Sequence, residues 1–142
     1  MSATTKDFVA EAAGNDHAHC LMCGACNPRS LKLTFEADGE TVRTTFQARP
    51  TLQGYTGILH GGVVASLLDS AMTHCLFHHG VKGLTGDLHV RFVWPVPCDA
   101  PVQVCAWILS VTGPLYRLRA ELRHEQRVMA WAEAKFMQRR EP

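Results

Sequence analysis

One stretch of 20 residues, from His60 to His79, most constrains how this chain can fold. It is largely apolar, it lies between Gly-rich segments, and it contains no Lys, Arg or Glu. Its length and its bounding glycines favour a helix. The other candidate elements alternate apolar and polar residues, so each has one face that needs cover. This stretch is the only long apolar element available, and we therefore predict a helix buried against a sheet.

Six segments alternate in this way and predict antiparallel strands. Two lie before the helix, and the Asp-Gly pair between them is a strong hairpin signal. Four lie after it, and we expect them to form a long meander. The predicted strands are residues 31–37, 41–48, 84–94, 101–111, 115–124 and 127–138. The sequence thus predicts an α+β fold, an antiparallel β-sheet of about six strands wrapped around a long central helix.

The size and charge of the chain limit its organisation and its partners. Its 142 residues contain no repeat and no long linker, so we expect a single domain over 1–142. A net charge of +1 is too small to attract nucleic acid or anionic lipid. No segment approaches the roughly 18 apolar residues of a membrane span, and the N-terminus lacks the pattern of an export signal. We therefore expect a cytoplasmic protein that binds neither nucleic acid nor membrane.

The predicted helix has a narrow polar stripe. At 100° per residue, Gly62, Ser66, Asp69 and Thr73 fall on one side of it. A solvated helix face normally carries Lys, Arg and Glu, so we infer that this stripe lines a cleft. A lone carboxylate there is costly unless it is hydrogen-bonded or needed for chemistry, which makes Asp69 a candidate general base or nucleophile. A role as a structural cap or a dimer contact stays open.

The start of the helix offers a second component. His60-Gly61-Gly62 leads into it, and the glycines leave the first N–H groups unobstructed. With the helix dipole behind them, such groups can hold the oxyanion that develops during acyl transfer. The alternative is a tight turn that glycine permits, with His60 as a cap or a packing group.

These residues also carry a resemblance to a family. The stretch "GYTGILHGGVVASLLDSAM" resembles the signature of hotdog-fold acyl-CoA thioesterases. It is similar to the branch of the phenylacetate-pathway (PaaI-like) enzymes and of the 4-hydroxybenzoyl-CoA thioesterase with its acid late on the helix. The matching positions are His60, Gly61, Gly62 and Asp69, with the acid nine residues after the histidine. Residues 85–97 and 128–138 resemble later strands of the family, so the likeness covers nearly the whole chain.

The resemblance implies roles for individual residues. Asp69 would be the catalytic acid, either as nucleophile on the thioester or as base for a water. The Gly61 N–H would be the oxyanion donor, Thr73 would help to hold the water or the intermediate, and His60 would order the turn. On the same stripe, the residues expected to contact substrate are Gly62 and Ser66.

The resemblance further implies an active site at a dimer interface, where the acid of one subunit faces the donor of the other, and a tetramer built as a dimer of dimers. The substrate would be an acyl-CoA or an acyl-carrier-protein thioester, hydrolysed to free acid and thiol. Coenzyme A would be part of the substrate, and no cofactor is expected. A non-catalytic hotdog module that binds acyl-CoA as a sensor or carrier is the alternative.

One position departs from the family pattern. The family usually has Asn or Gln six residues before the histidine, but in this chain the position six residues before His60 is Gly54. The adjacent Gln53 is therefore the candidate to bring a side-chain amide to the site. For the acyl pocket we expect an apolar lining. Its predicted members are Met72, Phe77, Phe92 and Trp94.

The N-terminal cysteines offer another kind of site. Cys20, Cys23 and Cys26 have C-x-x-C-x-x-C spacing, which with His17 or His19 could supply four zinc ligands, and an iron–sulfur site would look similar. The missing fourth cysteine and the family resemblance argue against both, so we predict no metal. We expect residues 1–30 to pack on or near the acyl pocket instead.

Overall fold

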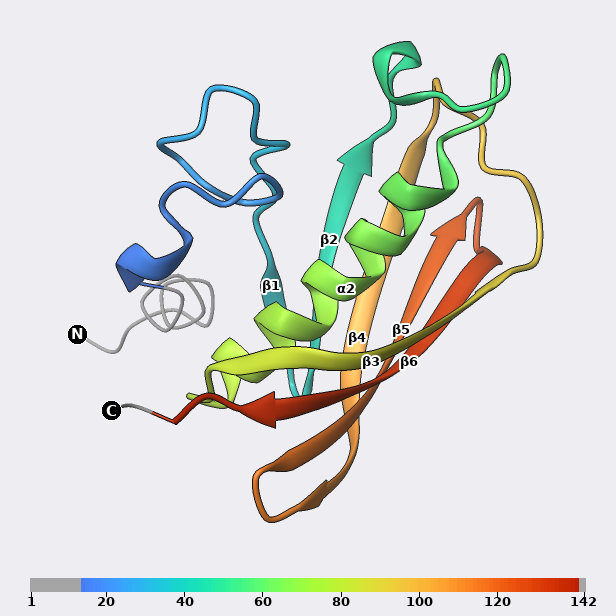
Figure 1. Ribbon diagram of the computed structural model, residues 1–142. Helices are drawn as coiled ribbons and strands as arrows, with labels where there is room; N and C mark the ends of the chain where they lie inside the picture. Colours follow the sequence, from blue (N-terminus) through green and yellow to red (C-terminus); the bar gives the residue numbers. More distant parts are fainter. Residues whose placement is uncertain (1–13, 141–142) are drawn as a thin grey trace.

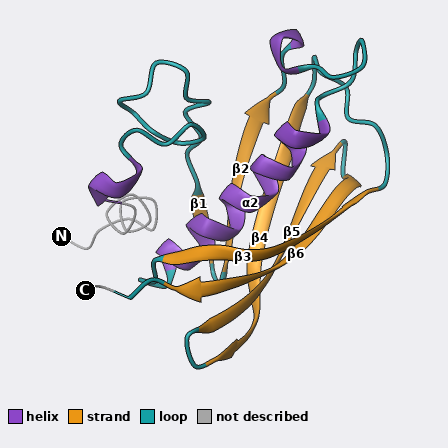
Figure 2. Ribbon diagram, viewed as in Figure 1, coloured by secondary structure: helices purple, strands orange, loops and turns teal. Residues whose placement is uncertain are grey.

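The computed structural model describes residues 14–140, and Figures 1 and 2 show the arrangement of their elements. Within residues 14–140, one α-helix and six strands follow each other in the predicted order, with two short 3-10 helices. The elements are η1 (Gly14–His17), β1 (Glu36–Asp38), β2 (Thr41–Gln47), η2 (Pro50–Leu52), α2 (Gly61–His78), β3 (Gly83–Phe92), β4 (Pro101–Thr112), β5 (Leu115–His124) and β6 (Arg127–Gln138).

The six strands form one antiparallel sheet that curves around α2 (Figure 2), which confirms the predicted α+β fold. The strand order is β1-β2-β4-β5-β6-β3. The prediction of one long meander is wrong in one respect, because β3 pairs with β6 and not with β4. Residues 93–100 join β3 to β4 and contain Pro95 and Pro97, so they do not form a tight hairpin turn. Strand β3 consequently lies at an edge of the sheet.

The first strand is shorter than predicted. Residues 31–35 belong to no strand, and their backbone bonds to the N-terminal segment: the Leu31 N–H donates to the Leu21 carbonyl at 2.9 Å, and the Leu33 N–H to the Met22 carbonyl at 3.0 Å. Lys32 between them has a φ of 56°, which interrupts a regular strand. The alternating pattern here reflects burial of Leu33 and Phe35 in the core, and β1 begins only at Glu36.

The core lies between α2 and the inner face of the sheet. Most of the helix surface is buried, and β6 contributes the small residues Ala130, Ala132 and Ala134, which allow the helix to approach closely. Phe136, on the same strand, is the bulkiest of the fully buried side chains. This packing covers the helix except on its polar stripe. No helix within residues 14–140 has the length and apolar character that crossing a membrane requires.

Candidate active site

The start of α2 presents one unpaired backbone donor. The His60 Nδ1 accepts the Gly62 N–H at 2.8 Å, so the histidine caps the helix and occupies that donor. The Val63 and Val64 N–H groups both donate to the His60 carbonyl. Within the described residues the Gly61 N–H has no acceptor. Gly61 is exposed, so this N–H is the one of the first turn that remains available to a ligand.

An apolar cavity of about 460 Å³ adjoins this donor. Gly61 lies on its wall, and a Cβ there would sit 3.5 Å from the Phe92 ring. Of the four residues predicted to line the acyl pocket, Phe92 and Trp94 line this cavity, whereas Met72 and Phe77 are buried in the core. The other residues that line the cavity are Tyr55, Ile58, Leu59, Val64, Val93, Pro95 and Val96.

Asp69 is half-buried about two turns further along the helix, and its carboxylate is held by a hydroxyl. The Thr85 Oγ1 donates to Asp69 Oδ1 at 2.6 Å, a short bond of the kind that ionised acceptors make. Burial raises the pKa of Asp69 above its ordinary value of 3.8, and the Thr85 hydrogen bond opposes that rise. The carboxylate is therefore both oriented and made more basic than a solvated one.

Sequence reasoning missed Thr85, because strict alternation places it on the outer face of β3. A bulge between Thr85 and Asp87 shifts the register, so that Thr85 lies opposite buried Phe136 while Leu88 lies opposite buried Ala134. Thr85 and Leu88 thus point to the same side, although they are three residues apart. Gly86 was the available signal, since an isolated glycine in a strand often marks a bulge.

The two hydroxyls of the polar stripe donate to helix carbonyls. The Thr73 Oγ1 donates to the Asp69 backbone carbonyl at 3.0 Å, and the Ser66 Oγ donates to the Gly62 carbonyl at 2.8 Å. Thr73 therefore lies beside the acid but contacts its backbone and not its carboxylate. Both residues are half-buried on the side of α2 that the sheet leaves uncovered.

The amide predicted to reach the site is used inside a loop. The Gln53 Oε1 accepts the Gly57 N–H at 3.1 Å, and the Gln53 side chain is exposed. At Gly54 a Cβ would lie 3.4 Å from the His60 Cα, so the chain passes close to the helix start there. The structure thus gathers the predicted residues in two places, the cap with Gly61 and the stripe with Asp69, and leaves Gln53 in the loop before the cap.

These two places cannot serve one carbonyl within a single protomer. Gly61 and Asp69 are eight residues apart on α2, which at 1.5 Å per residue is about 12 Å. A nucleophile and an oxyanion donor must both come within about 3 Å of the same reacting carbonyl. Within one protomer Gly61 and Asp69 therefore lie too far apart to act on the same carbonyl.

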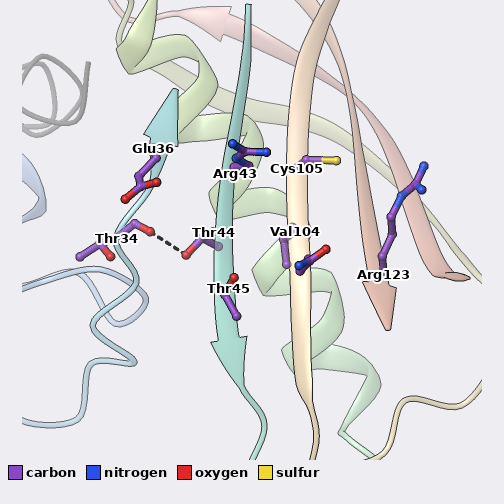
Figure 3. Close-up of a pocket in the computed structure, with 9 residues that line it drawn as sticks. Thr34, Glu36, Arg43, Thr44, Thr45, Val104, Cys105 and Arg123 are labelled. Atoms are coloured by element: carbon purple, nitrogen blue, oxygen red, sulfur yellow. Dashed lines mark hydrogen bonds between the residues drawn. The ribbon is translucent and has the colours of Figure 1, made fainter. Parts of the chain in front are cut away.

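A second cavity, of about 470 Å³, lies on the outer face of the sheet across β1, β2, β4 and β5 (Figure 3). Its cations are already paired: Arg43 with Asp38 at 3.5 Å, and Arg123 with Glu121 at 2.8 Å. The sheet separates this cavity from α2, and much of its lining is polar. It does not suit an apolar acyl group.

The described part of the N-terminal segment lies at the other end of α2 from the apolar cavity. The His17 ring packs against Phe77 with 4.9 Å between centroids, and Asp16 pairs with Lys82 at 3.0 Å and with Arg139 at 3.2 Å. Residues 1–13 lie outside the described residues. The prediction that 1–30 pack on or near the acyl pocket stays a prediction.

Comparison with known proteins identifies the family. The model of the family described as the Thioesterase superfamily matches residues 56–130, which include both halves of the candidate site. The chain belongs to the thioesterase superfamily. Among curated relatives, "Acyl-coenzyme A thioesterase THEM4" of Bos taurus is 32% identical over 89 residues, which cover 63% of this chain and 36% of that protein. This chain therefore spans about a third of the length of the curated relatives that it matches.

Solved structures agree with the fold of this thioesterase superfamily member. A thioesterase superfamily protein is similar with a TM-score of 0.76 and 28% identity, covering 80% of this chain and 60% of that one. A phenylacetic acid degradation-related protein from Ralstonia eutropha JMP134 has a TM-score of 0.74 at 15% identity and covers 92% of this chain and 98% of that one. The predicted membership of the hotdog thioesterase superfamily is confirmed.

Proposed function

We propose that this chain is an acyl-CoA thioesterase, which hydrolyses the thioester of an acyl-CoA, or of an acyl-carrier protein, to a free acid and a thiol. The observation that carries the proposal is the unpaired Gly61 N–H at the wall of an apolar cavity. A thioester with an apolar acyl group needs this combination of an oxyanion donor and a place for its chain. Family membership and the similarity to bovine acyl-coenzyme A thioesterase THEM4 support the same reaction.

Asp69 supplies the nucleophilic half of the reaction. As an ionised carboxylate it either attacks the thioester carbonyl or takes a proton from an attacking water. The oxyanion that develops accepts the Gly61 N–H at the positive end of the helix dipole. Collapse of the intermediate releases the thiolate of coenzyme A, which takes up a proton. With water as the attacking group this gives the free acid directly; with Asp69 as the nucleophile it leaves an acyl–Asp69 anhydride, which water then hydrolyses to the free acid and the Asp69 carboxylate. No step requires a metal or a cofactor beyond the coenzyme A of the substrate.

The proposed site is shared between two copies of the chain, because the acid and the donor are about 12 Å apart on one helix. Strand β3 is the expected contact. It is an edge strand, and its apolar residues Leu84, Leu88 and Phe92 are exposed in the single protomer. The family resemblance extends this dimer to a dimer of dimers, and we place the protein in the cytoplasm.

Thiol release from a panel of short, medium, long and aromatic acyl-CoAs tests the proposal. Asp69→Asn keeps the shape of the side chain and removes its base, so we expect kcat to fall by about 10²- to 10⁴-fold while the circular dichroism spectrum stays unchanged. An active Asp69→Asn enzyme would refute the assignment. If the wild type binds acyl-CoA but releases no thiol from any member of the panel, the chain is the sensor or carrier instead.

Single-turnover hydrolysis in ¹⁸O-labelled water tests the nucleophilic role of Asp69. If Asp69 is a base, the new oxygen of the free acid comes from labelled water and no label enters the protein. If Asp69 is a nucleophile and water attacks the Asp69 carbonyl of the anhydride, that oxygen comes from the Asp69 carboxylate and the label enters the protein, which identifies the nucleophile. Mass spectrometry of the product and of the protein reads both outcomes.

A further inference from the structure

The segment with the clustered cysteines folds into a compact loop beside the C-terminal half of α2 (Figure 1). Three backbone hydrogen bonds close it. The Cys20 N–H donates to the His17 carbonyl at 3.1 Å, the Gly24 N–H to the Cys20 carbonyl at 2.8 Å, and the Cys26 N–H to the Ala18 carbonyl at 2.8 Å. The proposed hydrolysis makes no use of this loop, so its construction has another cause.

Three metal-ligating atoms converge inside the loop. The His17 Nδ1 lies 3.5 Å from the Cys23 Sγ, and the ligand atoms of His17, Cys20 and Cys23 all lie within 4.8 Å of one another. Zn–S bonds of about 2.3 Å and Zn–N bonds of about 2.0–2.1 Å at tetrahedral angles separate the two donor atoms by about 3.5 Å. The distance between the histidine nitrogen and the cysteine sulfur is therefore already that of a zinc site.

The loop also holds Cys20 in place. The Met22 N–H donates to the Cys20 Sγ at 3.3 Å, which fixes the position of the sulfur. Gly24 allows the chain to close over the turn, since a Cβ there would lie 2.4 Å from the Cys20 nitrogen and 2.6 Å from the Ala18 oxygen. Any larger residue would force the backbone apart. These contacts preorganise the loop for a ligand at its centre.

A fourth donor lies on the helix that the loop covers. His74 is 6% exposed, and within the described residues neither of its ring nitrogens has a hydrogen-bond partner. A buried polar group without a partner is costly, so a ligand that it could bind would remove the cost. Its ring centroid lies 6.1 Å from that of His17, and Phe35 stacks on it at 4.3 Å. Because its nitrogens lie outside the 4.8 Å group, the ring must move toward the loop to join it.

We propose that His17, Cys20, Cys23 and His74 bind one Zn²⁺ ion, which fastens the N-terminal loop to helix α2. Two sulfur and two nitrogen ligands are a tetrahedral set that structural zinc sites use. Four protein ligands leave no open position, so the ion stabilises the fold and takes no part in hydrolysis. Cys26 is exposed and is not one of the group. This proposal departs from the expectation of no metal, because His74 of the helix supplies the fourth ligand in place of Cys26.

Metal analysis of the full chain, produced with added zinc and purified without a histidine tag, tests the site. We expect one zinc per chain, and after replacement by Co²⁺ the thiolate-to-cobalt charge-transfer absorption and the intense d–d bands of tetrahedral cobalt. Removal of the ion by a chelator should lower Tm, and added Zn²⁺ should restore it. Protein that retains no zinc and gives no such cobalt spectrum overturns the proposal, as does a Cys20–Cys23 disulfide in protein prepared without oxidant.

Three variants assign the ligands. Cys23→Ser should abolish binding, whereas Cys26→Ser, the matched control, should bind zinc like the wild type. His74→Leu, which keeps an apolar side chain beside the loop, should weaken binding at least tenfold in competition with a chromophoric chelator. Unchanged affinity in His74→Leu overturns the four-ligand assignment. If Cys23→Ser fails to fold, the cobalt titration of the wild type still decides. Asp69→Asn should lose hydrolysis and keep its zinc, so the two proposals fail separately.

Discussion

Replacing Thr85 by valine tests whether the Asp69 carboxylate is the reacting group. The Thr85 hydroxyl donates to Asp69 Oδ1 at 2.6 Å, and valine keeps the shape of the side chain without the donor. Hydrogen bonds to charged groups contribute about 1.5–3 kcal/mol. Because Thr85 is exposed in the single protomer, we take the lower end, about 1.5 kcal/mol. On the acid side of the Asp69 pKa, the ionised fraction of the carboxylate and with it kcat/KM should therefore fall about tenfold.

The pH profile of this variant should also move in a definite direction. Burial raises the pKa of Asp69, and the Thr85 hydrogen bond lowers it. Only the ionised carboxylate reacts, so kcat/KM rises as the pH increases through this pKa. Without the hydroxyl the pKa rises further, and the acid limb of the profile shifts to higher pH. Loss of thioester absorbance, followed over a pH series, measures both the rate and the limb.

Two controls separate this effect from general damage to the site. Thr85→Ser keeps the donor and should retain most of the activity. Thr73→Val removes a hydroxyl that donates to the Asp69 backbone carbonyl and not to the carboxylate, so the acid limb should stay in place. The reasoning is refuted if Thr85→Val has the wild-type kcat/KM and the wild-type acid limb of the pH profile. It is also refuted if Thr73→Val shifts the acid limb as far as Thr85→Val does.

Three further predictions concern the helix start and the sheet edge. Gly61→Pro removes the proposed oxyanion donor at a helix position where proline is tolerated, so kcat should fall about 10²- to 10³-fold with unchanged circular dichroism, while the control Gly61→Ala keeps most of the activity. His60→Ala loses the cap on Gly62, so urea denaturation should show a free energy of unfolding lower by about 0.5–2 kcal/mol. Leu88→Lys puts a charge on the β3 edge, so sedimentation should show monomers and activity should fall with the dimer; an active monomer would contradict the shared site.

The helix and the later strands could be predicted because their patterns are long and regular. The predicted helix, 60–79, differs from Gly61–His78 by one residue at each end. The order of the strands was harder to predict. The alternation of apolar and polar residues shows that β3 has one apolar face, but it does not show which strand β3 pairs with. The length of the β3–β4 connection was the clue, and it argued against a hairpin.

The candidate site could be predicted only where its signal is local in sequence. Asp69 stands out as the one acidic residue of its helix, and Gly61 follows from the cap pattern. Thr85 depends on a bulge that reverses the direction of its side chain. His74 depends on tertiary packing, because its position on α2 shows nothing of the cysteine loop folded against it. The spacing of residues in the sequence reveals neither the bulge at Thr85 nor the packing of the cysteine loop against His74.

Because Gly61 and Asp69 lie about two turns apart on α2, catalytic competence in the proposed dimer belongs to a pair of subunits and not to one chain. A subunit without the acid still lends its donor to its partner, and a subunit without the donor still lends its acid. Mixed dimers of Asp69→Asn and Gly61→Pro chains would thus hold one intact site beside one doubly defective site. Random exchange of subunits would restore about a quarter of the wild-type activity from two inactive proteins. Two different loss-of-function alleles of such a protein would complement each other in one cell.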